Sequence, residues 1–221
     1  MVTGGDGRIF AIGDIHGCYQ KLRQLFARLP YVPERDTLVF LGDYIDRGWQ
    51  SREVIAFILE LRRQGGRVIT LTGNHEYLVL EYQRTADPVL LPYLHRLGVE
   101  ATLRSYGVSH LKALQDLAFL PAAHFDFFTQ LLPYWETEEY IFVHAGLTPG
   151  VPLPEQDLPT LCETRSVFYT REHDFGRPVI FGHSPFELPL VTPTKIGIDT
   201  GAVYGNLLTA VELPGRIFYH A

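Results

Sequence analysis

Residues 9–17, with the sequence IFAIGDIHG, join an apolar run to a glycine and two polar side chains. The same arrangement returns in LVFLGDYIDRG at 38–48 and in ITLTGNHE at 69–76. Short apolar runs of this kind are typical of buried strands. Between them lie two segments with apolar residues at helical spacing, 21–29 and 51–64. The first third of the chain therefore predicts a β-α-β-α-β order, with parallel strands covered by helices.

An interval of about 70 residues separates the third of these strands from the next apolar run, at 140–143. A crossover between parallel strands needs only about a dozen residues or more, so this interval must hold extra structure. It contains four helical patterns, near 76–83, 89–97, 110–117 and 123–132. The last third is rich in strand patterns, at 179–181, 195–198, 207–213 and 217–219. We expect one α/β domain over residues 1–221, with a helical lid inserted at about 84–139.

The composition is that of an ordinary globular protein. The 221 residues are 46% hydrophobic and 20% charged, which argues against a disordered or collagen-like chain. A net charge of -6 argues against nucleic acid as a partner. No stretch approaches the ~20 apolar residues of a membrane helix, and the first residues lack the pattern of a secretory signal. We therefore expect a cytoplasmic protein without a membrane partner, in which Cys18 and Cys162 are free thiols.

Polar side chains follow five of the apolar runs, where the predicted strands end. Ligands of α/β sheets bind beyond the carboxyl ends of the strands, so these side chains should meet in one place. A single histidine after a strand is more often an ordinary hydrogen-bonded residue, but five such strand ends favour a shared metal site. The residues are Asp14, His16, Asp43, Asp46, Arg47, Asn74, His75, His144 and His183. Five histidines lack this context and have no predicted role: His95, His110, His124, His173 and His220.

The residue types indicate which metals fit. Carboxylates, imidazoles and an amide, without thiolate, suit Mn, Fe, Zn or Co better than a calcium cage or a structural zinc site. The set is too large for one catalytic ion, so two ions sharing a carboxylate fit better. Paired ions about 3.5–4 Å apart activate water and stabilise phosphoryl displacement. They would also invert the local field of an acidic protein that otherwise repels phosphate.

The motifs GDIHG, GDYIDRG, GNHE, VHAG and FGHS resemble, in order, the signature of the metallophosphoesterases. In particular they are similar to the phosphoprotein phosphatase (PPP) family in its bacterial and phage serine/threonine branch. The resemblance runs from Gly13 to His183 and continues in GIDTGAVYG at 197–205. It implies the calcineurin-like metallophosphoesterase fold, a central β-sandwich of mixed sheets flanked by helices.

The resemblance also implies two divalent metal ions, with Mn as the first candidate and Fe, Zn or Co as alternatives. Asp43 would bridge the two ions, and a hydroxide between them would attack phosphorus directly. The first ion would be held by Asp14, His16 and Asp43. The second would be held by Asp43, Asn74, His144 and His183.

Further roles follow from the same resemblance. His75 would protonate the leaving oxygen, oriented and kept cationic by Asp46. Arg47 would bind phosphate oxygens together with Asn74, which suits the fixed donor fork of arginine. A second phosphate-binding arginine is expected between the last two histidines. Arg165 is the first candidate for it, ahead of Arg171 and Arg177.

The resemblance favours a serine/threonine protein phosphatase, because DRG and GNHE occur together. The alternative is a symmetrical bis(5'-nucleosyl)-tetraphosphatase, since the IDTGAVYG form is similar to those enzymes too. The substrate would be a phosphoprotein in the first case and a phosphorylated small molecule in the second. The SAPNYC segment of eukaryotic members is missing, and Tyr204 is a weak substitute for its tyrosine. A catalytically dead binding protein is disfavoured by the complete ligand and acid set.

The predicted lid should decide between these substrates. A phosphoprotein needs an open groove, whereas a dinucleotide needs an enclosing pocket with basic or stacking residues. Five lid residues could serve a nucleotide, although ordinary surface positions on helices explain them as well. They are Tyr93, His95, Arg96, Arg104 and Tyr106.

Overall fold

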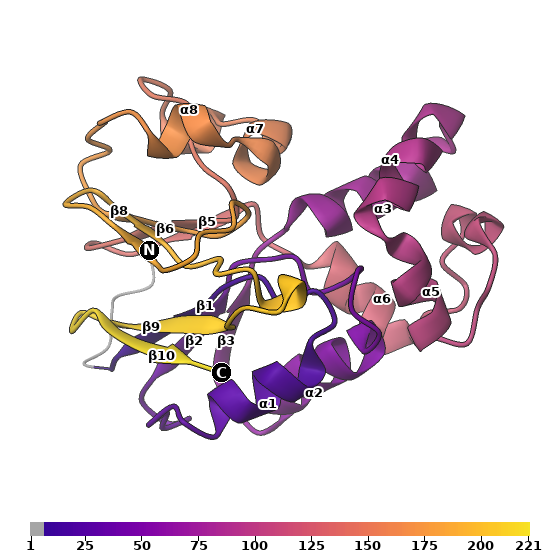
Figure 1. Cartoon of the computed structure of the whole chain (residues 1–221), viewed down its shortest axis with the longest axis horizontal. Coiled ribbons are helices and arrows are strands. Elements are labelled where there is room, and N and C mark those ends of the chain that lie inside the picture. Colours follow the sequence, from indigo (N-terminus) through magenta and orange to yellow (C-terminus); the bar gives the residue numbers. More distant parts are fainter. Residues whose placement is uncertain (1–6) are drawn as a thin grey trace.

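Two five-stranded sheets lie face to face in the computed structural model, which describes residues 7–221 (Figure 1). The first sheet has the order β10-β9-β1-β2-β3. Its strands are β1 (Ile9–Ile12), β2 (Thr37–Phe40), β3 (Arg67–Thr70), β9 (Thr209–Leu213) and β10 (Ile217–His220). The second sheet has the order β4-β5-β6-β8-β7. Its strands are β4 (Tyr134–Glu136), β5 (Ile141–Val143), β6 (Val179–Phe181), β7 (Leu190–Val191) and β8 (Lys195–Gly197).

Both sheets are mixed, with a parallel centre and antiparallel edges. In the first sheet β1, β2 and β3 are parallel and in register, with Phe40 opposite both Ile12 and Thr70. In the second sheet β5, β6 and β8 are parallel. Because these strands end level with one another, the loops that follow them leave the sandwich at one edge.

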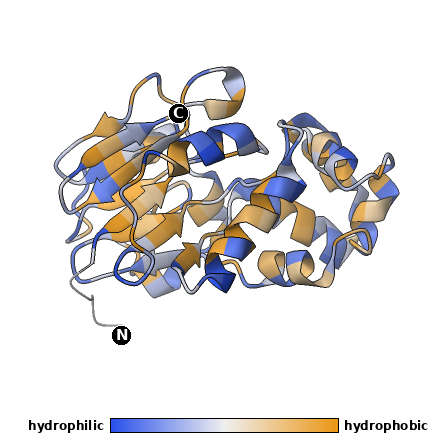
Figure 2. Cartoon of the chain, turned by 90° about the horizontal axis from the view of Figure 1, so that it is seen from below, coloured by the Kyte–Doolittle hydropathy of each residue, from blue (hydrophilic) through white to orange (hydrophobic). Residues whose placement is uncertain are grey.

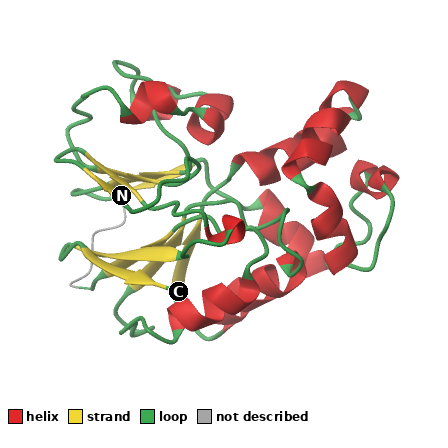
Figure 3. Ribbon diagram, viewed as in Figure 1, coloured by secondary structure: helices red, strands yellow, loops and turns green. Residues whose placement is uncertain are grey.

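Apolar side chains of both sheets form one buried cluster between them, and the strands are coloured mainly as hydrophobic in Figure 2. The first sheet contributes Ala11, Val39 and Val211, and the second contributes Phe142 and Ile180, all of them fully buried. The two outer faces are covered by helices (Figure 3). Helices α1 (Tyr19–Phe26) and α2 (Ser51–Arg63) cover the first sheet, and the short α7 (Leu158–Glu163) and α8 (Ser166–Tyr169) cover the second.

The segment between β3 and β4 is mainly helical and lies beside the sandwich in Figure 1. It holds α3 (Asn74–Thr85), η1 (Pro88–Leu90), α4 (Leu91–Leu97), α5 (Val99–Ser105), η2 (Leu111–Gln115) and α6 (Ala122–Thr129). The end of the predicted 84–139 interval is not helical, since β4 pairs antiparallel with β5. The action of this insertion as a lid stays a prediction. Among residues 7–221, no helix is long and apolar enough to cross a membrane.

A buried carboxylate ties the start of β1 to the turn before β2. Asp36 accepts hydrogen bonds from the Arg8 guanidinium at 2.8 Å and from the Val32 backbone N–H at 2.9 Å. Arg35 Nε donates a further bond of 3.1 Å. Burial would raise the pKa of Asp36, but these bonds outweigh it and lower the pKa to about 2.

We expect Asp36→Asn to lower the free energy of unfolding near pH 7 by about 2 kcal/mol, the equivalent of this pKa shift. A lowered folded-state pKa stabilises above the unfolded value, and the effect is lost as pH falls through about 2. The difference in unfolding free energy between variant and parent should therefore shrink by roughly half at pH 3. Urea unfolding at pH 7 and at pH 3 measures this difference. Glu34→Gln, on an exposed neighbour, is the control, and a difference independent of pH would contradict the ion pair.

Candidate metal centre

The structure brings the residues predicted at the five strand ends to one edge of the sandwich, around Asp43. Asp43 Oδ2 lies 3.3 Å from His16 Nε2 and 3.8 Å from His75 Nε2. Asp43 Oδ1 lies 3.4 Å from His144 Nε2. Asp43 therefore faces side chains that come from three other loops.

Two groups of possible ligands share Asp43. His16, Asp43 and His75 form one, and Asp43, His144 and His183 form the other, with ligand atoms within 4.8 Å of one another in each. Asn74 joins the second group, because its Oδ1 lies 3.1 Å from His183 Nδ1 and 3.4 Å from His144 Nε2. Asp14 belongs to neither group. Its carboxylate accepts the backbone N–H of His183 at 3.0–3.1 Å.

The histidine tautomers fit metal ligation. His16 Nδ1 lies 2.9 Å from the Ile45 carbonyl oxygen, and His144 Nδ1 lies 2.9 Å from that of Leu41. A carbonyl only accepts, so each Nδ1 carries the proton and each Nε2 presents a lone pair to the centre. Burial lowers the pKa of His16, of His144 and, to about 3, of His183. These rings are therefore neutral at pH 7, the form that binds a metal.

The buried polar atoms also fit a cation. Nε2 of His75 and of His183 is buried without a hydrogen-bond partner among the described residues. Burial raises the pKa of Asp14, and the nearby Asp199 and Asp43 carboxylates raise it further. A divalent ion held by the lone pairs of His16 Nε2 and His144 Nε2 would relieve this concentration of negative charge.

The loops reach this geometry through strained or glycine-dependent backbone. His16, Asp43 and His183 have φ of 46°, 52° and 64°, in the left-handed region that side-chain-bearing residues rarely adopt. A Cβ on Gly73 would lie 2.2 Å from Asp43 Oδ1, and one on Gly182 would lie 2.2 Å from Asp14 Oδ1. Only glycine lets the two carboxylates approach the neighbouring loops this closely.

His75 is aligned by two further residues. Its Nδ1 lies 2.7 Å from Asp46 Oδ2, and both side chains are fully buried. The other oxygen, Asp46 Oδ1, accepts a 2.6 Å bond from Thr102 Oγ1, and the backbone N–H of Asp46 donates to the same hydroxyl at 2.8 Å. The structure therefore joins Asp46 to His75 as the sequence predicts, and adds Thr102 from α5 as the residue that holds Asp46.

The arginines differ in their positions. Arg47 Nη1 lies 2.7 Å from His16 Nε2, and its guanidinium lies 5.4 Å from the ring centre of Tyr204. Arg165 is exposed at the start of α8, and its charge lowers the pKa values of His144 and His183. Arg177 instead pairs with Glu136 at 2.6 Å. Among the described residues, Arg47 thus contacts the metal centre, Arg165 makes no contact with it, and Arg177 pairs with a residue of β4.

Comparisons with known proteins agree with this geometry. The profile of the calcineurin-like phosphoesterases matches residues 7–202. The chain belongs to this family. Its members are hydrolases with a dinuclear divalent metal centre, so the predicted fold, the metal dependence and the phosphoester chemistry are confirmed at that level.

Individual relatives of this calcineurin-like phosphoesterase are nucleotide hydrolases by name. The asymmetrical bis(5'-nucleosyl)-tetraphosphatase PrpE of Bacillus velezensis is 29% identical, covering 92% of this chain and 88% of its own. The symmetrical enzyme of Methylococcus capsulatus is 34% identical over 64% of this chain and 44% of its own. A crystal structure provisionally described as a diadenosine tetraphosphatase has a TM-score of 0.75 at 22% identity, covering 100% of this chain and 95% of its own. The serine/threonine phosphatase branch is not confirmed.

Sequence reasoning missed Glu76, which shapes the metal centre of this phosphoesterase. Its wholly buried carboxylate accepts the backbone N–H groups of Asp43 at 3.0 Å, Tyr44 at 2.8 Å and Gly73 at 3.2 Å. It thereby joins the loop after β2 to the start of α3. The only signal was the last letter of GNHE, because the donors lie up to 33 positions away and are backbone groups.

Asp199, in the IDTGAVYG segment, is a further buried carboxylate without a predicted role. Burial raises its pKa to about 6, and its Oδ1 accepts the Gly201 N–H at 2.9 Å. Its charge acts on Asp14, as described above. The Asp199 carboxylate of this segment thus adds negative charge near Asp14, a predicted metal ligand.

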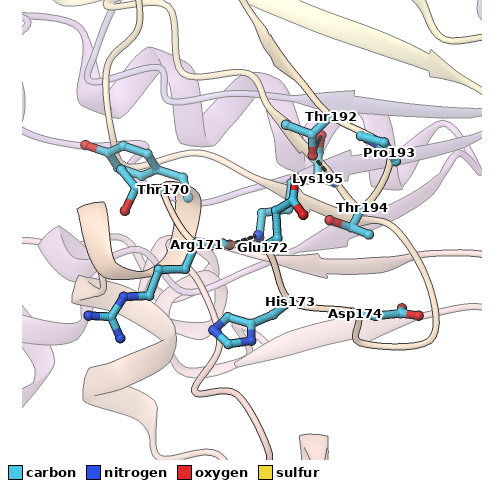
Figure 4. A pocket seen from close by; sticks show the side chains of 10 residues that line it. Thr170, Arg171, Glu172, His173, Asp174, Thr192, Pro193, Thr194 and Lys195 are labelled. Atoms are coloured by element: carbon cyan, nitrogen blue, oxygen red, sulfur yellow. Dashed lines mark hydrogen bonds between the residues drawn. The ribbon is translucent and has the colours of Figure 1, made fainter.

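Figure 4 shows a cavity whose lining includes none of the predicted metal ligands. It has a volume of about 410 Å³ and is lined by residues 169–174 and 192–195. Arg171 belongs to this wall, and its carbonyl accepts a 2.6 Å bond from the buried Lys195 ammonium. Arg171 therefore lies outside the predicted phosphate site, which leaves Arg165 as the better placed candidate.

We expect Asp43→Asn to lower bound metal and activity together, because it removes a negative charge from the carboxylate shared by both ligand groups. Metal analysis of dialysed protein measures the loss. Asp46→Asn is the matched control, since Asp46 contacts His75 and Thr102 and belongs to neither group. It should keep the metal, and an Asp43→Asn protein with the metal content of the parent would refute the bridge.

Proposed function

We propose that this calcineurin-like phosphoesterase hydrolyses dinucleoside tetraphosphates, and that it cleaves them asymmetrically into a nucleoside triphosphate and a monophosphate. The observation that carries the hydrolase chemistry is the pair of ligand groups that share Asp43, with the His75 ring beside them. The substrate class is supported by the PrpE relative, which covers most of both chains. The match to the relative named as a symmetrical enzyme covers less than half of that enzyme's length.

The proposed roles of the side chains follow from their positions. Bound divalent ions supply the positive charge that activates water and stabilises the reacting phosphoryl group. His75 is held by Asp46 through Nδ1, so its Nε2 is the atom that donates a proton to the leaving phosphate oxygen. Because Nε2 has no protein hydrogen-bond partner among the described residues, this proton is available to substrate.

Arg47 is the proposed phosphate-binding residue. Its guanidinium donates to His16 Nε2, the same lone pair that the tautomer of His16 presents to a metal. If His16 Nε2 held a metal, the Arg47 guanidinium would be free to bind phosphate oxygens with its donor fork. Arg165 supplies further positive charge from the opposite sheet, where it acts on His144 and His183.

The substrate class is tested by comparing rates on diadenosine tetraphosphate and on a phosphoserine peptide with one Mn-loaded sample. We expect the dinucleotide to be cleaved faster and a chelator to abolish the reaction. Chromatography of the products separates the cleavage modes, since ATP plus AMP indicates asymmetrical and two ADP indicates symmetrical cleavage. Faster dephosphorylation of the peptide would replace the proposal by the protein-phosphatase hypothesis, and inactivity on both in metal-loaded protein would refute both.

We expect His75→Asn to slow turnover by roughly 10²–10⁴-fold, as for loss of a general acid, while the bound metal stays. The side chain of asparagine cannot deliver the proton that the ring donates. Measuring kcat and metal content on the same preparation separates the two roles of this residue, because His75 also lies in one ligand group. Loss of metal in this variant would make His75 a ligand rather than the acid.

A further inference from the structure

We propose that a second cavity, beside the metal centre, binds one nucleoside base of the substrate by stacking on Trp49. This inference rests on the proposed function, but the experiments below separate the two. The cavity has a volume of about 350 Å³, within the roughly 300–1,000 Å³ of small-molecule sites. Its wall comes from the loop after β1, the start of α1 and the loop before α2: residues 17, 18, 20, 21 and 47–50, with Val203.

Arg47 connects this cavity to the reacting centre. The residue lines the cavity, and its guanidinium lies 2.7 Å from His16 Nε2 on the other side. The ring of Tyr204 packs on the same guanidinium at 5.4 Å. A phosphate bound by Arg47 thus stands at the mouth of the cavity, and the nucleoside attached to the phosphate chain can enter it.

Trp49 offers the cavity an aromatic face that the fold does not use. Its side chain is 63% exposed, and it belongs to no apolar cluster among the described residues. The Arg104 guanidinium lies 5.4 Å from the indole centre, and Arg104 does not line the cavity. Arg104 therefore packs on the indole without lining the cavity, and the indole stays largely exposed. Any base can stack on such a face, because every base has a π system.

The charge of the cavity suits a polyphosphate. Its lining includes two cations, Lys21 and Arg47, and no carboxylate, although the whole chain has a net charge of -6. The Lys21 ammonium donates to the carbonyl oxygens of Ala202, at 2.7 Å, and Asn206. It thus fixes the turn that carries Tyr204 as well as contributing positive charge. A cationic wall next to an open indole fits a nucleotide better than an apolar side chain of a peptide.

Binding can be measured without turnover through Trp49 fluorescence. In a Trp135→Phe protein, Trp49 is the remaining tryptophan, because the chain has two. We expect ADP, added to the metal-loaded protein, to quench this emission in a saturable way, and inorganic triphosphate to leave it unchanged. The Trp49→Phe protein, which keeps Trp135 beside Phe142, should not respond. Equal quenching in both variants, or none in either, would overturn the base site.

Kinetics give a second readout. We expect Trp49→Ala to lower the ratio of kcat/KM for diadenosine tetraphosphate to that for p-nitrophenyl phosphate by roughly 5- to 150-fold, the loss of one base–aromatic stack. Trp49→Phe should restore most of the ratio. Tyr93→Ala is the matched control, since Tyr93 is also exposed and also packs on an arginine, Arg96 at 4.5 Å. An equal loss in the control would place the base on the helical insertion instead.

The outcomes separate this inference from the proposed function. Cleavage of diadenosine tetraphosphate with an unchanged ratio in Trp49→Ala would overturn the base site and leave the function standing. Saturable quenching of Trp49 by ADP in a protein that cleaves only phosphopeptides would support the site and reject the function.

Discussion

The shape of the metal centre depends on one buried carboxylate that lies outside both ligand groups. Glu76 accepts the backbone N–H groups of Asp43, Tyr44 and Ile45, at 3.0, 2.8 and 3.3 Å, where the chain leaves β2. Buried N–H groups need partners, and a buried carboxylate is tolerable only with several donors, so each side satisfies the other. The position of the shared ligand Asp43, in the left-handed region, follows from this contact. The loop that continues to Asp46 and Arg47 therefore starts from a fixed point.

The sequence predicted the parts of this structure that depend on local pattern. The strands β1, β2 and β3 overlap the predicted runs, because an apolar run before a glycine indicates a strand that is buried on both faces of a sheet. Short elements such as α5 and the two-residue β7 were not predicted, since long-range packing rather than local periodicity stabilises them. The same limit applies to the site. His144 and His183 follow strands and could be predicted, whereas Thr102 reaches Asp46 from 56 positions away.

The residues that carry the chemistry differ from those that select the substrate. The motif residues around Asp43 fit two metals and a phosphoryl group, which a phosphoserine and a phosphoanhydride have in common. They therefore could not decide between a protein phosphatase and a nucleotide hydrolase. Residues outside the metal ligands must make that choice, and Trp49, directly after the DRG motif, is such a residue. Its exposed indole contributes nothing to the apolar clusters of the described chain, so folding does not explain it.

One short helix of the insertion, α5, contacts both the residue that orients the proposed acid and the proposed base site. Thr102 of α5 holds Asp46, and thereby the orientation of the His75 ring. Arg104, two residues later, packs on Trp49 at the base site. Residues two apart on a helix point in different directions, so α5 can contact Asp46 with one side and the indole of Trp49 with another. A shift of α5 would therefore disturb proton donation and base stacking together.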